Sequence, residues 1–198
     1  MALASAPNSW LKGLPNKLSL LRMAAVPVLL LLYPIGPSLG ILCGFVFAAA
    51  AVTDWIDGYI ARRYGMVSPL GALLDQVADK MLVASALVLL SNAGVLPAFI
   101  AALLICRDIA INGIRLMALE HNVVIAVGDF GKWKTALLSV GITCLFVNRP
   151  VFDLPVHEVG MISMWIGLAL SLYSAWSYSH AFLANQQNHP NPPPTAMT

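Results

Sequence analysis

The chain has 198 residues, of which 59% are hydrophobic and only 10% are charged, and its mean hydropathy is +0.80. Soluble domains average about 25% charged residues, so this composition excludes an ordinary soluble domain and predicts an integral membrane protein. The net charge of +2 is too small to indicate a nucleic-acid partner.

Six apolar segments are each long enough, or nearly so, to cross a bilayer as a helix, which takes about 20 residues. In chain order they span residues 14–33, 39–62, 70–91, 95–120, 131–148 and 159–183. Breaks rich in Pro or Gly lie at "YPIGPS", "SNAGVLP" and "NRPVFDLPVHE". The sequence therefore predicts an all-α, polytopic protein with six transmembrane helices in one domain over residues 1–185. Residues 8–16 would form a short interfacial segment, and the polar, proline-rich residues 186–198 a disordered tail.

The positions of Lys and Arg predict the orientation in the membrane. One set of loops and helix ends carries Lys12, Lys17, Arg62, Arg63, Lys132 and Lys134, whereas the other set, at 34–38, 91–95 and 149–158, carries only Arg149. We therefore expect the first set to be cytoplasmic. Both termini would then be cytoplasmic as well, which agrees with an even number of spans.

Four of the nine acidic residues lie between two apolar runs, in the segments 39–62 and 70–91. Asp54 and Asp57 are three residues apart and share a face of the first helix, whereas Gly71, Asp75 and Asp79 form a stripe on the second. The connection is short, so the two helices are expected to be antiparallel neighbours. Their four carboxylates would then meet at one depth.

Four carboxylates at one place would repel one another, so this pattern favours a site for cations. Carboxylate oxygens prefer hard cations such as Mg²⁺ or Mn²⁺, and a pair of such ions about 4 Å apart suits displacement at phosphorus. Polar contacts between helices, or a proton path, are the alternatives. Gly58, Ala61 and Gly71 would serve either helix packing or the approach of a phosphate to the backbone.

The stretch "DWIDGYIARRYGMVSPLGALLDQVAD" matches the pattern D-x2-D-G-x2-A-R-x8-G-x3-D-x3-D without a gap, from Asp54 to Asp79. It resembles the signature of the CDP-alcohol phosphotransferase family, in which eight fixed residues at fixed spacing make the match specific. The resemblance implies a metal-dependent enzyme that transfers a phosphatidyl group from CDP-diacylglycerol to an alcohol and releases CMP. It also allows a homodimer.

Within that family, "PNKLSLLRMAAVPVLLLL", "AVTDWIDGYIARR", "LLDQVADK" and "GKWKT" resemble the bacterial phosphatidylglycerophosphate synthase branch. This implies sn-glycerol 3-phosphate as the acceptor and the cell inner membrane as the location. Gln76 and Asp108 depart from the branch pattern, which has Pro and Glu there. Inositol phosphate, serine and phosphatidylglycerol are alternative acceptors. Outside the enzyme class, a metal or proton transporter, or a scaffold protein descended from an enzyme, would be the alternatives.

Arg107, Asp108, Asn112 and Arg115 fall on one face of the predicted helix 95–120. Arg107 lies roughly 18 Å from the cytoplasmic end of that helix, too deep to reach water there easily. Asp108 is adjacent in sequence and is expected not to face it. A phosphate in a polar, cytoplasm-facing cavity would match the two-pronged guanidinium. The alternative is an ion pair between Arg107 or Arg115 and an aspartate on another helix.

Lys132 and Lys134 flank Trp133 at the start of the fifth helix, where they would either anchor the helix at the cytoplasmic surface or line the acceptor-phosphate site. Arg22, in the first helix, would lie near the site or extend to the surface.

The proposed roles of the remaining residues complete the expected mechanism. The resemblance supports contacts of Arg62 and Ser68 with the nucleotide phosphates, and Gly58 and Gly71 would also border CDP-diacylglycerol. Asp54, Asp57, Asp75 and Asp79 would hold two divalent cations. Asp79, deepest in its stripe, would accept a proton from the acceptor hydroxyl.

Overall fold

The computed structural model describes residues 14–64, 69–120, 130–149 and 155–188. Within these ranges the fold is all-helical, without strands. The six α-helices are α2 (Leu14–Leu32), α3 (Gly40–Tyr64), α4 (Pro69–Asn92), α5 (Ala98–Glu120), α6 (Phe130–Val147) and α7 (Val156–Asn188). Two short 3₁₀ turns, η1 (Tyr33–Ile35) and η2 (Pro37–Leu39), join α2 to α3. The prediction of six helices is thus confirmed, with most boundaries within three residues of those expected. The helix α7 continues three residues beyond residue 185, to Asn188.

Local sequence explains where α4 and α6 end. After α4, the backbone N–H of Val95 donates to Leu90 O at 3.0 Å and that of Gly94 to Ser91 O at 3.0 Å. This pattern needs a left-handed residue, and Gly94 supplies it with φ of 71°. At the end of α6, Asn148 takes φ of 41°, a conformation that Asn tolerates better than most residues. Its side-chain Oδ1 lies 2.9 Å from His157 Nδ1, at the start of α7.

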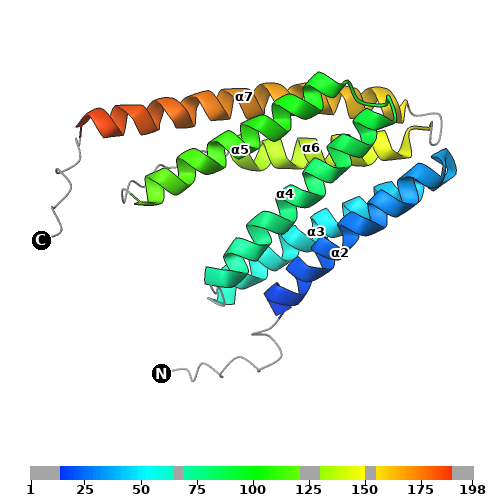
Figure 1. The fold of residues 1–198 in the computed structure, drawn as a ribbon, viewed down its shortest axis with the longest axis horizontal. Coiled ribbons are helices and arrows are strands. Elements are labelled where there is room, and N and C mark those ends of the chain that lie inside the picture. Colours follow the sequence, from blue (N-terminus) through cyan, green and yellow to red (C-terminus); the bar gives the residue numbers. More distant parts are fainter. Residues whose placement is uncertain (1–13, 65–68, 121–129, 150–154, 189–198) are drawn as a thin grey trace, which may run out of the picture.

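The helices form two groups that cross each other (Figure 1). Helices α2, α3 and α4 make one group, in which α2 packs against both α3 and α4, while α3 and α4 contact each other only sparsely among the described residues. In the other group α7 packs against α5 and α6. Contacts between α3 and α6, and between α4 and α5, join the two groups.

Successive helices run in opposite directions, so the described chain begins and ends at the same end of the bundle (Figure 1). The turns between α2 and α3 and between α4 and α5 lie at the other end, where the two groups converge, as do the end of α6 and the start of α7. The expectation that α3 and α4 run antiparallel is confirmed, although α2 makes more of the contacts with each of them than they make with each other.

The apolar core occupies the half of the bundle near these turns. Its buried members come from the second halves of α2, α4 and α6 and from the first halves of α3, α5 and α7; they include Leu29, Phe47, Leu87, Ile100, Phe146 and Met164. Glycines allow close approach there. A Cβ on Gly40 would overlap the backbone carbonyl of Phe146, and one on Gly141 would lie 2.9 Å from Met164 Sδ.

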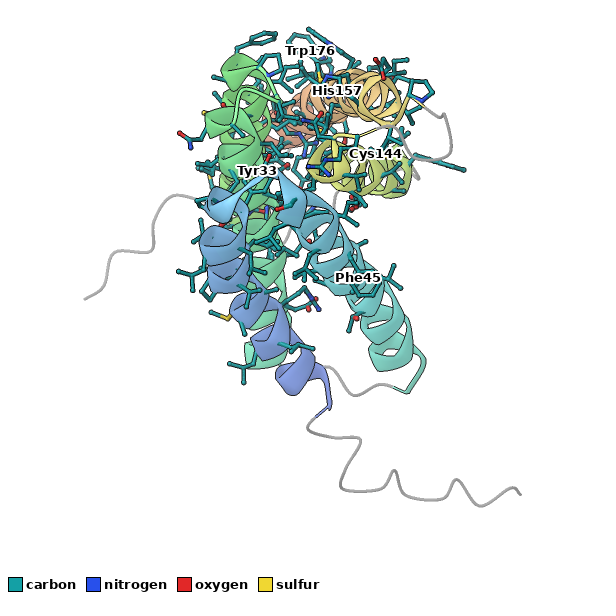
Figure 2. All side chains as sticks on the ribbon, turned by 90° about the vertical axis from the view of Figure 1, so that its right-hand side faces the viewer. Tyr33, Phe45, Cys144, His157 and Trp176 are labelled. Atoms are coloured by element: carbon teal, nitrogen blue, oxygen red, sulfur yellow. The ribbon has the colours of Figure 1, made fainter. Side chains whose placement is uncertain are left out.

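Large apolar side chains also cover the outside of the bundle. Phe45 on α3 and Trp176 on α7 are 69% and 73% exposed, and Figure 2 shows both on the outer faces of their helices. Among the described residues, one segment, Val156–Ala184, is long and apolar enough by itself to cross a membrane. Shorter apolar segments lie at Leu20–Leu32, Gly40–Thr53 and Trp133–Val147.

Candidate active site

Charged side chains gather in the half of the bundle opposite to the apolar core. The change from apolar to charged occurs within about one helical turn on several helices: Val26 and Arg22 on α2, Leu82 and Asp79 on α4, Leu104 and Arg107 on α5, and Leu138 and Lys134 on α6. Because a charge is costly in an apolar interior, this separation concentrates polar chemistry in one half of the molecule. All of the predicted site residues with described side chains lie in that half.

On α4, Asp75 and Asp79 are four residues apart, as the sequence predicts, and therefore lie one turn apart on the same side of the helix. Asp75 Oδ1 lies 2.9 Å from Arg22 Nη2 on α2. The Arg22 side chain is only 2% exposed, whereas that of Asp75 is 45% exposed. Arg22 therefore lies inside the site and does not extend to the surface, which decides between the two expectations for this residue.

Asp79 lies within electrostatic range of Arg22, Lys80, Asp75 and Asp108. Among the described carboxylates, Asp79 therefore lies between the acidic side of α4 and the charged residues of α5. A hydrogen bond from Gln76 Nε2 to Asn112 Oδ1, 3.1 Å long, adds a direct contact between these two helices. Gln76, which stands where the family branch has proline, thus makes a side-chain contact with α5 that proline could not make.

Arg107 and Lys134 both bind the carboxylate of Asp108. Arg107 Nη1 lies 2.8 Å from Asp108 Oδ1, and Lys134 Nζ lies 2.9 Å from the same oxygen. Arg107 Nε also donates a 2.9 Å hydrogen bond to the backbone carbonyl of Ser171 on α7. These contacts join α5, α6 and α7 in one ionic cluster.

The expectation that Asp108 does not face Arg107 is wrong. Neighbouring Cα–Cβ bonds do point about 100° apart on a helix, but the arginine side chain is long enough for its guanidinium to reach around to the carboxylate. Among the described side chains, the acidic partner of Arg107 is therefore an aspartate on its own helix. Lys134 is only 8% exposed and contacts Asp108, which favours a place in the charged cluster over an anchor at the membrane surface.

The other predicted site residues are placed less completely. Asp54, Asp57, Gly58 and Arg62 lie on the last part of α3, Gly71 on the first part of α4, and Lys132 at the start of α6, but the side chains of these residues lie outside the description. Ser68 lies outside the described residues. Arg115, on the last part of α5, is exposed and lies within electrostatic range of Lys80.

Among the side chains that are described, no three His, Cys, Asp or Glu residues are grouped closely enough to hold a metal ion. Asp54 and Asp57 are not among these side chains. Asp75 and Asp79 supply carboxylate oxygen donors, and this donor chemistry fits a hard cation such as Mg²⁺ or Mn²⁺.

Comparison with known proteins gives an independent result. The CDP-alcohol phosphatidyltransferase family matches residues 12–173, which include the four aspartates and every described member of the charged cluster. The Bacillus subtilis protein named CDP-diacylglycerol–glycerol-3-phosphate 3-phosphatidyltransferase is 30% identical over 84% of this chain and 93% of its own length.

Two further relatives show the breadth of the similarity. A Rickettsia prowazekii protein with the same name is 32% identical over 86% of this chain and 95% of its own length. A rice protein named cardiolipin synthase (CMP-forming) is 35% identical over 87% of this chain and 58% of its own length. Both the signature and the extent of these matches lead to one assignment: the chain belongs to the CDP-alcohol phosphatidyltransferase family of enzymes.

Proposed function

We propose that this protein transfers the phosphatidyl group of CDP-diacylglycerol to sn-glycerol 3-phosphate, giving phosphatidylglycerophosphate and CMP. The observation that carries this proposal is the meeting of two kinds of residue at Asp79: the acidic face of α4 on one side, and the basic residues of α5 and α6 on the other. An acidic face suits cations that bind a pyrophosphate, and a basic cluster suits the phosphate of the acceptor. The names of the bacterial relatives support the same pair of substrates.

The proposal places all six helices across a membrane, with both termini on the cytoplasmic side. Alternating helix directions and the many exposed apolar side chains support this arrangement. The charged half of the bundle would face the cytoplasm and enclose a polar cavity. Acyl chains of CDP-diacylglycerol would then stay in the bilayer while the nucleotide and the acceptor enter from water.

Asp54, Asp57, Asp75 and Asp79 would hold two divalent cations, Mg²⁺ or Mn²⁺. When bound, such cations neutralise a pyrophosphate and stabilise the negative charge of the departing CMP. The two described carboxylates fit this role because they lie one turn apart on α4, with Asp75 also fixed by Arg22. Positioning of a ligand by a neighbouring charged group is common around bound metals.

The protein's own residues would bind the two substrates. Arg62 and Ser68 would bind the nucleotide phosphates, and Gly58 and Gly71 would allow the lipid headgroup to approach the backbone. Arg107, Arg115, Lys132 and Lys134 would bind the phosphate of the acceptor.

Asp79 would accept the proton of the C1 hydroxyl. The hydroxyl oxygen then forms a bond to the β-phosphorus of CDP-diacylglycerol. The bond from that phosphorus to the bridging oxygen of CMP breaks, and its electron pair leaves with CMP.

A second candidate acceptor is phosphatidylglycerol, which would make this protein a cardiolipin synthase. The similarity to the rice cardiolipin synthase is the observation that favours it. A homodimer is the assembly that we expect in either case.

Purified protein with labelled CDP-diacylglycerol and Mg²⁺ tests the proposal directly when acceptors are compared one at a time. We expect CMP release to depend on sn-glycerol 3-phosphate and to be at least tenfold faster with it than with phosphatidylglycerol, inositol phosphate or serine, because only a matched acceptor satisfies the buried cations. Faster release with phosphatidylglycerol would instead show cardiolipin synthesis. No release with any acceptor would contradict the enzyme and leave transport or a scaffold role.

A further inference from the structure

Asp108 is the shared anion of two buried cations. Its Oδ1 accepts contacts from Arg107 Nη1 at 2.8 Å and from Lys134 Nζ at 2.9 Å. The Arg107 and Lys134 side chains are each 11% exposed, but the Asp108 side chain is 32% exposed. The carboxylate is therefore more accessible than either cation, and an anion that enters the site would meet Asp108 beside both donors.

The surrounding charges leave this cluster positive. Lys80 lies within electrostatic range of Asp108, Arg115 and Lys134, and Lys134 lies within range of Arg107 and Asp79. Among the described residues, five cations therefore share three carboxylates: Arg22, Lys80, Arg107, Arg115 and Lys134 with Asp75, Asp79 and Asp108. Because charges interact strongly where water is largely excluded, this excess favours a further anion with about two negative charges.

We propose that the carboxylate of Asp108 competes with the acceptor phosphate for the same two cations, Arg107 and Lys134. Without acceptor, its carboxylate holds Arg107 and Lys134 together and offsets their mutual repulsion. A phosphate monoester then takes over these donors, since its oxygens match the guanidinium fork and carry more charge than one carboxylate. This inference rests on the proposed function for the identity of the acceptor, but not for the presence of an anion site.

The backbone contact of Arg107 supports this exchange. Its Nε is held by the carbonyl of Ser171, which does not depend on Asp108. Therefore, when Asp108 gives up its contact, the guanidinium stays tied to α7 and keeps Nη1 in the site. Lys134 can follow the anion because its flexible stem ends in a point charge.

Asp108→Asn is the decisive variant, because the amide keeps the size of the side chain and can still accept a hydrogen bond. Loss of the carboxylate should destabilise the protein without ligand, since two cations lose their counter-charge. It should also strengthen binding of sn-glycerol 3-phosphate at least threefold, because the competing anion is gone. Glu158→Gln is the matched control: the same chemical change at an exposed residue in the first turn of α7, at the opposite end of the bundle.

The experiment measures thermal unfolding of the purified wild type and both variants in detergent, against increasing sn-glycerol 3-phosphate and, separately, glycerol. We expect Asp108→Asn to have the lowest Tm without ligand and the largest rise in Tm with sn-glycerol 3-phosphate. Glycerol should change none of the three, and Glu158→Gln should follow the wild type. Equal or weaker binding of sn-glycerol 3-phosphate by Asp108→Asn would overturn the proposal, because Asp108 would then position the cations without competing for them.

A charge-balanced double variant covers the case in which Asp108→Asn is too unstable to purify. Asp108→Asn combined with Lys134→Met removes one charge of each sign and leaves only Arg107 without its counter-charge. The double variant should therefore have a lower Tm than Lys134→Met, which keeps the Arg107–Asp108 pair, and sn-glycerol 3-phosphate should raise its Tm more than that of Lys134→Met. A double variant as stable as Lys134→Met would contradict the role of Asp108 as counter-charge.

The acceptor assay separates this inference from the proposed function. If the wild type transfers to sn-glycerol 3-phosphate but Asp108→Asn does not bind it more tightly, only this inference fails. If the wild type does not use that acceptor, inorganic phosphate replaces it as the probe. Tighter phosphate binding by Asp108→Asn then supports the anion site and overturns the acceptor, and unchanged phosphate binding overturns both.

Discussion

Arg107 makes two contacts of different kinds, an ion pair with Asp108 and a hydrogen bond with the backbone of α7. Its replacement should therefore affect both stability and acceptor binding. We expect Arg107→Ala to lower the Tm and to raise the KM for sn-glycerol 3-phosphate at least tenfold, since a charged hydrogen bond contributes about 1.5–3 kcal/mol. The KM for CDP-diacylglycerol should barely move, because the nucleotide is expected beside α3 and α4.

Arg107→Lys is the matched control and should restore acceptor binding only in part, since lysine lacks the planar fork. Steady-state kinetics of the purified variants measure both KM values. Equal losses for both substrates would assign Arg107 a structural role only and leave Arg115 and Lys132 as candidates for the acceptor phosphate.

The backbone and the side chain of Ser171 are expected to have different effects on stability. Its carbonyl accepts the hydrogen bond from Arg107, whereas its Oγ is fully buried without a hydrogen-bond partner among the described residues. A buried, unsatisfied hydroxyl destabilises a fold by about 1–3 kcal/mol. Ser171→Ala keeps the carbonyl and removes the hydroxyl, so the Tm should stay the same or rise. A fall of several degrees in thermal unfolding would show that the hydroxyl has a partner after all.

Some features of the site could be predicted from the sequence and others could not. The spacing of Asp75 and Asp79 was sufficient to place them on one side of α4, because helix geometry fixes it. The contacts of Arg22 with Asp75 and of Lys134 with Asp108 could not be predicted, since they depend on how separate helices pack. The sequence pointed to such partners only by placing an arginine and a lysine within apolar segments.

At the scale of helices, close packing at glycine positions holds α3 against α6 and α6 against α7. A methyl group on Gly40 would overlap the carbonyl of Phe146, whereas one on Gly113 would meet no atom within 4 Å. Gly40→Ala should lower stability by about 1–3 kcal/mol, as overpacking usually does. Gly113→Ala, the matched control, should be neutral or raise stability by up to about 1 kcal/mol, because alanine favours a helix.

Thermal or denaturant unfolding in detergent compares these two glycine variants. Similar losses for both would mean that the contact of α3 with α6 at Gly40 has no special role.

The helices themselves were well predicted from the sequence because each apolar run stands between strong breaks. Pro69 begins α4 and Gly94 follows its end, as expected from the fixed φ of proline and the freedom of glycine. The packing order was less predictable: the short connection between α3 and α4 indicated neighbours, but each of them packs more closely against α2 than against the other. Periodicity gives the face of a helix, not the partner that covers it.

At the scale of the molecule, the apolar and charged halves of the bundle have different roles. The apolar half, built around residues such as Leu87 and Phe146, packs the two groups of helices together where they converge. The charged half contains Asp75, Asp79 and the cluster around Asp108. This division allows polar substrates to be handled at one end without disturbing the packed core.

The central claim is that the four signature aspartates, Asp54, Asp57, Asp75 and Asp79, support metal-dependent phosphatidyl transfer in this charged half. CMP release from CDP-diacylglycerol by Asp57→Asn, measured at saturating Mg²⁺ and sn-glycerol 3-phosphate, tests it most directly, with Glu158→Gln as the control and the Tm as a check of folding. We predict a folded Asp57→Asn protein with almost no turnover, because a lost metal ligand costs several kcal/mol of transition-state stabilisation. A folded variant that keeps more than about a tenth of the wild-type rate, a loss of less than about 1.4 kcal/mol, would contradict the claim.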